Sequence, residues 1–277
     1  MYDTFAVDRL IDLWLQEDIG HVDLTTQLMI EAHETGHFYM NAREPLVVAG
    51  IEVSAQVFKR YDPQLSVTVH VKDGQSVAKG ARLMDVQGSA RSFLTVERTA
   101  LNIIQRLSGI ARETARYVKA IEGTRARLLD TRKTTPGLRM LEKHAVSCGG
   151  GLNHRLGLDN GVMIKDNHIV VAGSIALAVQ RARRGLPLLT RIEVECDRLA
   201  QVQEALDAGA DVIMLDNMPL DAMREAVRLV GARVPLEASG GISLESIRAV
   251  AETGVDFIST SKAHQSAPAV DIGFDDA

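Results

Sequence analysis

Residues 191–217, RIEVECDRLAQVQEALDAGADVIMLDN, contain a short apolar run, an amphipathic segment and a second apolar run. The two runs, Arg191–Cys196 and Asp211–Asn217, have the length and composition of buried strands. Between them, apolar residues recur at the three- and four-residue spacing of a helix over Asp197–Ala208. This order predicts two parallel strands joined by a crossover helix.

The same strand–helix unit repeats on both sides of this stretch. Strands are predicted over Ala126–Asp130, Gly161–Asn167, Val234–Gly241 and Val255–Thr260, and helices over Ala172–Arg184, Asp221–Val230 and Leu244–Thr253. The last four strands begin about 20 residues apart, which is the period of a βα repeat with short loops. Because no dinucleotide-binding glycine motif is present, we expect an α/β fold with a barrel of parallel strands; a doubly wound open sheet is the alternative.

The N-terminal third has a different pattern. A helix is predicted over Phe5–Glu17, then short strands and one further helix, Ile51–Tyr61. Ser92–Tyr117 is the longest helical pattern, with an expected break near Ser108–Gly109. We therefore place a first domain at residues 1–108 and the barrel at 109–265, with a tail, 266–277, that can pack back on the first domain.

Residues Val71–Gly88 contain three glycines between short strand-like pieces. This pattern is found in the small β-sandwich of lipoyl and biotinyl carrier domains, which would make the chain a non-enzymatic carrier. Lys72 and Lys79 lack the flanking pattern of a modified lysine, so a structural β-element is the preferred interpretation.

Composition excludes several classes of protein. The 277-residue chain has a net charge of −5 and 4% aromatic residues, which disfavours nucleic-acid binding. Its two cysteines, Cys148 and Cys196, form no disulfide or zinc pattern, as expected of reduced thiols in the cytosol. No apolar run has the length of a membrane span, and the acidic, amphipathic N-terminus does not resemble a signal peptide. We expect a cytoplasmic protein.

A basic region interrupts this acidic chain. Between Arg125 and Lys165, eight Arg and Lys residues stand against three acids. Such a local excess of cations indicates a discrete anion-binding site.

Polar residues at the predicted strand ends suggest what this site contains. The carboxyl ends of parallel strands meet on one rim of a barrel. Arg132 and Arg155 can bind carboxylates or phosphates through two hydrogen bonds each, and Lys133 and Lys165 add compact charge. The rim residues are Arg132, Lys133, Arg155, Lys165, Glu195, Asp216, Ser239, Gly240 and Gly241.

The acidic and glycine residues of this rim have their own expected roles. Glu195 and Asp216 can hold Mg²⁺ or stabilise a sugar-derived cation, and the amides of Ser239-Gly240-Gly241, before a helix, can bind phosphate. Each also has a structural alternative: a strand-end carboxylate can cap the next helix, and His168 can orient its loop. We expect His144 on a helix surface.

Several motifs in this order resemble one enzyme family. They are DTRKTTPGLR (Asp130–Arg139), CGGGLNHRLGL (Cys148–Leu158), IKDNHI (Ile164–Ile169), EVE (Glu193–Glu195), MLDN (Met214–Asn217) and EASGGI (Glu237–Ile242). Together with EDIG, DLTT and ERTALN nearer the N-terminus, they cover nearly the whole chain. The chain resembles the quinolinate phosphoribosyltransferase family, also called nicotinate-nucleotide pyrophosphorylase (carboxylating).

The resemblance implies a fold and a reaction. Such enzymes have an N-terminal α/β sandwich and a C-terminal open α/β barrel. They are pentosyltransferases that combine quinolinate with 5-phosphoribosyl-1-pyrophosphate, using Mg²⁺, to give nicotinate mononucleotide, pyrophosphate and CO₂ in NAD biosynthesis. They work as homodimers or larger assemblies of dimers, such as hexamers.

The resemblance also implies residue roles. Arg132, His154, Arg155 and Lys165 would line the quinolinate pocket, and Arg98 would reach the pocket of a partner subunit. Lys133, Glu195 and Asp216 would form the catalytic group around the phosphoribosyl donor, with Glu195 and Asp216 at the metal. Ser239, Gly240 and Gly241 would hold the 5-phosphate.

One segment departs from the family pattern. After Ser259 a Val-Gly pair is expected, but the chain has Thr260, Ser261 and Lys262. Ser261 then stands where a glycine amide would approach the phosphate.

Two related enzyme classes remain as alternatives. A paralogue associated with molybdenum transport should lack the asparagine before His154 and the IKDNHI run, both of which are present. Nicotinate phosphoribosyltransferases take a monocarboxylate and typically use ATP; the chain is short for that class and has no P-loop.

Overall fold

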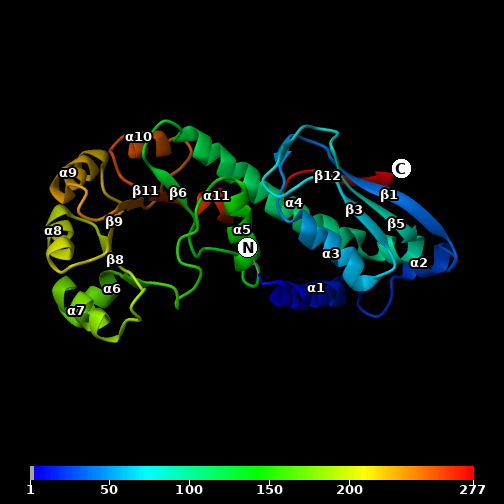
Figure 1. Ribbon diagram of the computed structural model, residues 1–277, viewed down its shortest axis with the longest axis horizontal. Helices are drawn as coiled ribbons and strands as arrows, with labels where there is room; N and C mark the ends of the chain where they lie inside the picture. The colour runs from blue at the N-terminus through cyan, green and yellow to red at the C-terminus, as the bar shows by residue number, and fades with distance from the viewer. Residues whose placement is uncertain (1–2) are drawn as a thin grey trace. The chain divides into compact units, whose positions relative to one another are not determined.

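The computed structural model describes residues 3–277 (Figure 1). The chain forms two compact units. The first unit holds the chain up to residue 115 together with residues 135–150 and 266–277, and the second holds residues 116–134 and 151–265. Each unit has its own hydrophobic core.

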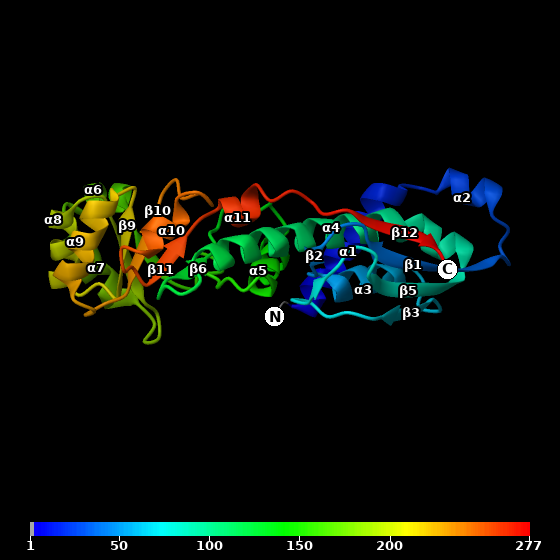
Figure 2. The same cartoon turned by 90° about the horizontal axis from the view of Figure 1, so that it is seen from above.

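The first unit is built around an antiparallel sheet with strand order β12-β1-β5-β3. Its elements are α1 (Thr4–Ile19), α2 (Leu24–Met29), β1 (Thr35–Ala42), β2 (Leu46–Val47), α3 (Ile51–Tyr61), β3 (Ser66–Val69), β4 (Ser76–Val77), β5 (Arg82–Ser89), α5 (Arg139–Cys148), β12 (Ile272–Asp276) and most of α4 (Ala90–Ala120). The C-terminal strand β12 lies beside β1 (Figures 1 and 2). The segment Val71–Gly88 supplies the interior strand β5, so it is a structural part of this sheet.

Sequence features explain these elements. Asp3 caps α1 by accepting a hydrogen bond from the Phe5 amide, and the helix buries Val7, Ile11 and Leu15 at four-residue spacing. On the sheet, Phe38 stacks on Phe274, with ring centroids 5.3 Å apart. This contact joins β1 to the C-terminal strand.

The break expected near Ser108–Gly109 is wrong, because α4 continues without interruption from Ala90 to Ala120. Gly109 has a packing role instead. A Cβ at this position would lie 2.2 Å from the carbonyl oxygen of Pro268, so only glycine lets the C-terminal segment approach the helix. The predicted boundary at 108/109 lies within this helix.

The second unit has one parallel sheet with strand order β6-β11-β10-β9-β8-β7. Its strands are β6 (Arg127–Leu129), β7 (Val162–Ile164), β8 (Ile192–Cys196), β9 (Val212–Asp216), β10 (Leu236–Ser239) and β11 (Phe257–Ser259). Its helices are α6 (Asp166–Ala172), α7 (Ile175–Gly185), α8 (Leu199–Asp207), α9 (Leu220–Val230), α10 (Ile247–Ala251) and α11 (Lys262–Gln265).

This strand order decides between the two predicted α/β folds. From β7 to β11 each strand pairs with the next in sequence, and β6 pairs with β11. Right-handed crossovers that always advance in one direction place all their helices on the same face of the sheet. A doubly wound sheet would reverse direction at a switch point. The second unit is therefore an open barrel, in which the named strands β6 and β7 do not pair.

Two helix boundaries differ from the prediction and matter for the site. Asp166–His168 forms the first turn of α6 rather than a loop, and His168 Nδ1 accepts a hydrogen bond from the Lys165 amide. Helix α10 begins only at Ile247, because Ser243 and Ser246 hydrogen-bond each other in a preceding turn. His168 thus has the orienting role, and Gly241 does not lead directly into a helix.

Within residues 3–277, no helix combines the length and apolar character that crossing a lipid bilayer requires.

Candidate active site

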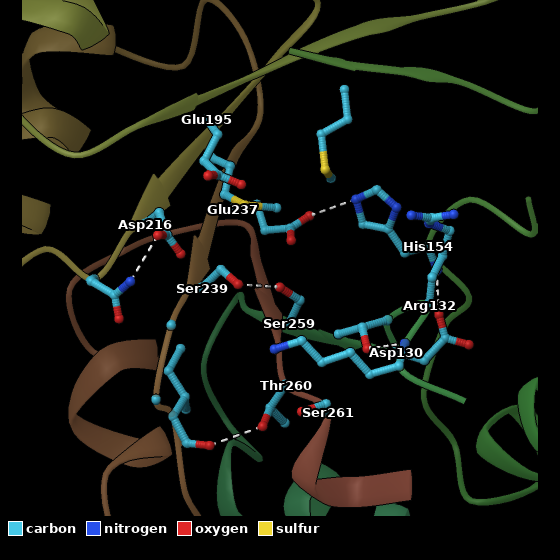
Figure 3. A pocket seen from close by; sticks show the side chains of 18 of the residues that line it. Asp130, Arg132, His154, Glu195, Asp216, Glu237, Ser239, Ser259, Thr260 and Ser261 are labelled. Carbon is cyan, nitrogen blue, oxygen red and sulfur yellow. Dashed lines mark hydrogen bonds and ion pairs between the residues drawn. The ribbon is translucent and has the colours of Figure 1, made fainter. Parts of the chain in front are cut away.

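A pocket of about 580 Å³ lies at the carboxyl ends of the parallel strands in the second unit (Figure 3). All the site residues predicted from the sequence line it except Arg98, which is an exposed residue of α4 in the first unit. The predicted residues that line it are Arg132, Lys133, His154, Arg155, Lys165, Glu195, Asp216, Ser239, Gly240, Gly241 and Ser261. These residues come together because parallel strands end on the same rim.

Asp130 anchors one wall of the pocket. It follows β6, is 2% exposed, and accepts hydrogen bonds of 2.8 Å from the Asn153 side chain and from the His154 amide. The loop that carries His154 is thereby attached to the end of β6. His264, on α11, accepts a 3.2 Å hydrogen bond from the amide of Thr131 and holds the segment that leads to Arg132.

His154 lies between two buried carboxylates, Glu193 and Glu237, of which Glu237 also lines the pocket. Its Nε2 is 2.9 Å from Glu193 Oε2 and 3.4 Å from Glu237 Oε2, the second contact being drawn in Figure 3. Burial lowers the pKa of His154, but hydrogen bonds and charge from the two carboxylates outweigh burial and raise it to about 10. Burial is also the main reason why the pKa of Glu237 is raised.

A second contact of His154 opposes this charge. Its Nδ1 accepts a 2.7 Å hydrogen bond from the Arg155 amide, which favours a neutral ring. One hydrogen bond is worth about 1 kcal/mol, whereas two adjacent buried carboxylates cost several if both are charged and unpaired. The cost of leaving both carboxylates charged and unpaired is the larger of the two free energies. The cluster of His154, Glu193 and Glu237 therefore retains one extra proton at neutral pH.

The cations of the rim crowd one another. Arg155 is oriented by a 3.1 Å hydrogen bond from Nη1 to the carbonyl oxygen of Gly161. Burial, and then the positive charge of Arg132, lower the pKa of the Arg155 guanidinium. A bound anion would relieve this repulsion. Lys165 forms an ion pair with Glu195 at the end of β8.

The opposite wall is shaped by close backbone contacts. Ser259 Oγ donates a 2.9 Å hydrogen bond to Ser239 Oγ, and Thr260 Oγ1 donates one of 2.9 Å to the carbonyl oxygen of Ile242 (Figure 3). Gly240 has φ +92°, and a Cβ there would lie 2.2 Å from Asn217 Oδ1. This wall therefore exposes backbone and hydroxyl groups that suit a phosphate. Its amides belong to a loop, since α10 begins further along the chain.

Glu195 and Asp216 lie on neighbouring strands of the same rim. Asp216 Oδ2 accepts a 2.7 Å hydrogen bond from the Asn217 side chain. Two carboxylates beside hydroxyl and amide groups are oxygen donors of the type that Mg²⁺ prefers, so the residues fit this ion in ligand chemistry.

Comparisons with known proteins identify the family of this chain. The sequence models for the C-terminal and N-terminal domains of quinolinate phosphoribosyl transferase match residues 110–275 and 23–108. The chain belongs to the quinolinate phosphoribosyl transferase family. The C-terminal match includes the whole pocket, and the N-terminal match includes Arg98.

Two full-length relatives of this family are similar to the chain. A probable nicotinate-nucleotide pyrophosphorylase (carboxylating) from Synechocystis is 46% identical over 96% of this chain and 91% of the relative. The corresponding protein of Bacillus subtilis is 43% identical over 96% and 92%.

Solved structures agree with the sequences. Nicotinate-nucleotide pyrophosphorylase from Francisella tularensis has a TM-score of 0.95 at 40% identity and covers 99% of this chain and 97% of its own. A human nicotinic acid phosphoribosyltransferase structure, at 12% identity and a TM-score of 0.61, shares the fold alone.

Sequence reasoning did not assign Glu193 and Glu237 to the site, although both lie in family motifs. The pattern that could have identified them is strand alternation, because side chains two residues apart point to the same face. Glu193 precedes Glu195 by two positions, and Glu237 precedes Ser239 by two. A carboxylate on the buried face of an otherwise apolar strand requires a partner, which here is His154. His264 was also missed, since its contact with Thr131 spans 133 residues.

The extra proton predicts a pH dependence of stability. The pKa of His154 is about 10 in the folded protein and 6.5 in an unperturbed imidazole, so the folded state binds one proton more between these values. This contribution is complete below pH 6.5 and is lost as pH rises to 10, by up to about 1.4 kcal/mol per pH unit.

The double variant Glu193→Gln, Glu237→Gln should lack this component, because no carboxylate then stabilises the imidazolium. Urea denaturation at a series of pH values measures both proteins. The difference in slope between them isolates this cluster from the other titrating groups. An unchanged slope in the double variant would contradict the assignment.

Proposed function

We propose that this chain transfers phosphoribosyl from 5-phosphoribosyl-1-pyrophosphate to quinolinate with decarboxylation. The products are nicotinate mononucleotide, pyrophosphate and CO₂, and the reaction serves NAD biosynthesis. Family membership supports this proposal, and one observation on the pocket supports the acceptor in particular. Arg132 and Arg155 lie close enough for the charge of one to lower the pKa of the other. A dicarboxylate such as quinolinate neutralises two cations at once.

The cationic wall would orient the acceptor. Arg132, Arg155 and Lys165 would bind the two carboxylates of quinolinate, with His154 held beside them by Glu193 and Glu237. Lys165 also contacts Glu195, so it connects the acceptor side of the pocket to the donor side. The protein mainly positions the ring nitrogen for attack and keeps water away from the reacting carbon.

The other wall would hold the donor. Ser239, Gly240, Gly241 and Ser261 would bind the 5-phosphate through amides and hydroxyl groups, and Lys133 would face the pyrophosphate. The ring nitrogen attacks C1 of the ribose as the bond to pyrophosphate breaks, and positive charge develops on the sugar. Glu195 and Asp216 would stabilise this charge. Mg²⁺ held by the same carboxylates would neutralise the pyrophosphate.

Decarboxylation follows from the charge on the new nucleotide. After attack, the pyridine nitrogen carries a positive charge next to the carbon that bears the first carboxylate. When the bond to CO₂ breaks, its electron pair remains on that ring carbon, where the adjacent cation stabilises it until a proton is added. The second carboxylate is retained in the product. The cationic residues that bind it can therefore keep the ring in place during decarboxylation.

We also propose a homodimer to which Arg98 contributes across the interface. Arg98 is exposed on α4, while every residue that lines the pocket belongs to the second unit. We further expect the enzyme to act in the cytoplasm, in keeping with its two free thiols, Cys148 and Cys196.

The reaction is tested by mixing the protein with quinolinate, 5-phosphoribosyl-1-pyrophosphate and Mg²⁺, with nicotinate replacing quinolinate in parallel tubes. We expect nicotinate mononucleotide and CO₂, measured by mass spectrometry, from quinolinate alone. Product from nicotinate alone would favour the monocarboxylate-specific class. No product from either acceptor, in folded protein that still binds the donor, would refute the proposed acceptor.

Arg155→Ala should weaken quinolinate binding by about 2–4 kcal/mol, because a charge-assisted contact is lost and its carboxylate is left unpaired. Isothermal calorimetry measures the dissociation constant, and circular dichroism checks the fold. Arg184→Ala, at an exposed position in the last turn of α7, is the matched control and should bind normally. Equal affinity of both variants for quinolinate would show that Arg155 does not bind this substrate.

The dimer proposal predicts complementation. Arg98→Ala and Lys133→Ala should each be inactive alone. A randomised 1:1 mixture should recover about a quarter of the wild-type sites, since half the dimers are mixed and each has one intact site. Mass spectrometry of labelled chains verifies subunit exchange. No recovery after proven exchange would mean that each site is built from one chain.

A further inference from the structure

A second group of chemically reactive side chains lies in the first unit, outside the proposed site. Asp73 follows β3 in the loop before β4, and His144 and Cys148 lie one turn apart on α5. None of the three lines the pocket of the second unit. The proposed reaction therefore gives them no role.

The three side chains converge on one point. His144 Nε2 is 2.7 Å from Asp73 Oδ2 and 3.5 Å from Cys148 Sγ, and all three ligand atoms lie within 4.8 Å of one another. Zinc binds sulfur at about 2.3 Å and nitrogen at about 2.0–2.1 Å, which in a tetrahedron separates the two atoms by roughly 3.6 Å. The sulfur–nitrogen separation of 3.5 Å is close to this value, whereas the 2.7 Å between His144 Nε2 and Asp73 Oδ2 would lengthen to roughly 3.4 Å when both atoms bind the ion.

The same geometry excludes a nucleophilic triad. In such a triad, histidine contacts the nucleophile through one nitrogen and the orienting carboxylate through the other. Here Nε2 contacts both Asp73 and Cys148. Burial, and then the charge of Asp73, also raise the pKa of the Cys148 thiol to about 12, so it is not an activated nucleophile.

The arrangement is rigidly supported. Asp73 Oδ1 accepts a 3.0 Å hydrogen bond from the Ile51 amide at the start of α3, which directs Oδ2 toward His144. Helix α5 is fixed by the buried residues Leu141, Ala145 and Val146. Asp73 and His144 are each 17% exposed, so the group is largely shielded yet within reach of an ion.

We propose that Asp73, His144 and Cys148 form a zinc site, with water as the fourth ligand. Sulfur, nitrogen and carboxylate donors together suit zinc and disfavour Mg²⁺, which prefers oxygen alone. On binding, the thiol proton leaves to solvent, a Zn–S bond forms, and no electron is transferred. The ion would connect α5 to the β3–β4 loop, and so brace the first unit.

The test uses the full chain after dialysis against a chelator. Zinc chloride is titrated in a calorimeter in the presence of excess Mg²⁺, which occupies carboxylate sites such as Glu195 and Asp216. We expect one zinc ion per chain, and at least a tenfold weaker dissociation constant for Cys148→Ser. Cys196→Ser changes the only other cysteine of the sequence, which lies in β8, and is the matched control that should bind as the wild type does.

Cobalt supplies a second readout that depends on the thiolate. Co²⁺ should give a sulfur-to-metal charge-transfer absorption in the wild type and in Cys196→Ser but not in Cys148→Ser. Asp73→Asn keeps the shape of the side chain and should also weaken binding tenfold or more, which guards against a Cys148→Ser variant that fails to fold. Absence of zinc uptake by the wild type would overturn the proposal, as would uptake that Cys148→Ser and Asp73→Asn leave unchanged.

Discussion

Two carboxylates buried close together beside the pocket determine where His154 and the residues attached to it lie. Glu193 and Glu237 come from separate strands, β8 and β10, and neither can remain charged in the barrel interior without a cation. His154 supplies the cation and is fixed by this role. Asp130 then holds the His154 amide, which sets where Arg155 begins. The position of Arg155 therefore depends on Glu193, Glu237 and Asp130, although these acids do not bind the anion themselves.

This layering separates charge within one small pocket. Glu193 and Glu237 balance His154, whereas Arg132 and Arg155 repel one another. A bound dicarboxylate would reduce this repulsion more than a bound monocarboxylate would, because it brings one negative charge for each guanidinium group. Lys165 and Glu195 already neutralise each other. The pair thus joins the cationic part of the pocket to the part with Asp216, Ser239 and Gly240.

The positions of polar residues at predicted strand ends made most of the rim predictable. Most rim residues lie at or just past the end of an apolar run, and parallel strands bring such ends together. These residues are Arg132, Lys133, Lys165, Glu195, Asp216 and Ser239. The continuous helix α4 was not predictable in the same way. Ser108 and Gly109 have the local pattern of a helix break. The close approach of Pro268 explains why residue 109 is a glycine within a continuous helix. The helix expected directly after Gly241 failed for a related reason, because the turn held by Ser243 and Ser246 competes with helical hydrogen bonds.

Local sequence patterns were sufficient to predict the repeated βα units, most of the residues that gather at one rim, and the family to which the chain is similar. These are consequences of local periodicity and of motifs, which do not depend on distant contacts. The barrel was expected from the sequence, but the placement of His154 between Glu193 and Glu237 and the contact of Asp73 with His144 and Cys148 emerged only in three dimensions. Each of these depends on pairing residues tens of positions apart, and such pairing is set by packing in three dimensions rather than by the order of neighbours in the chain.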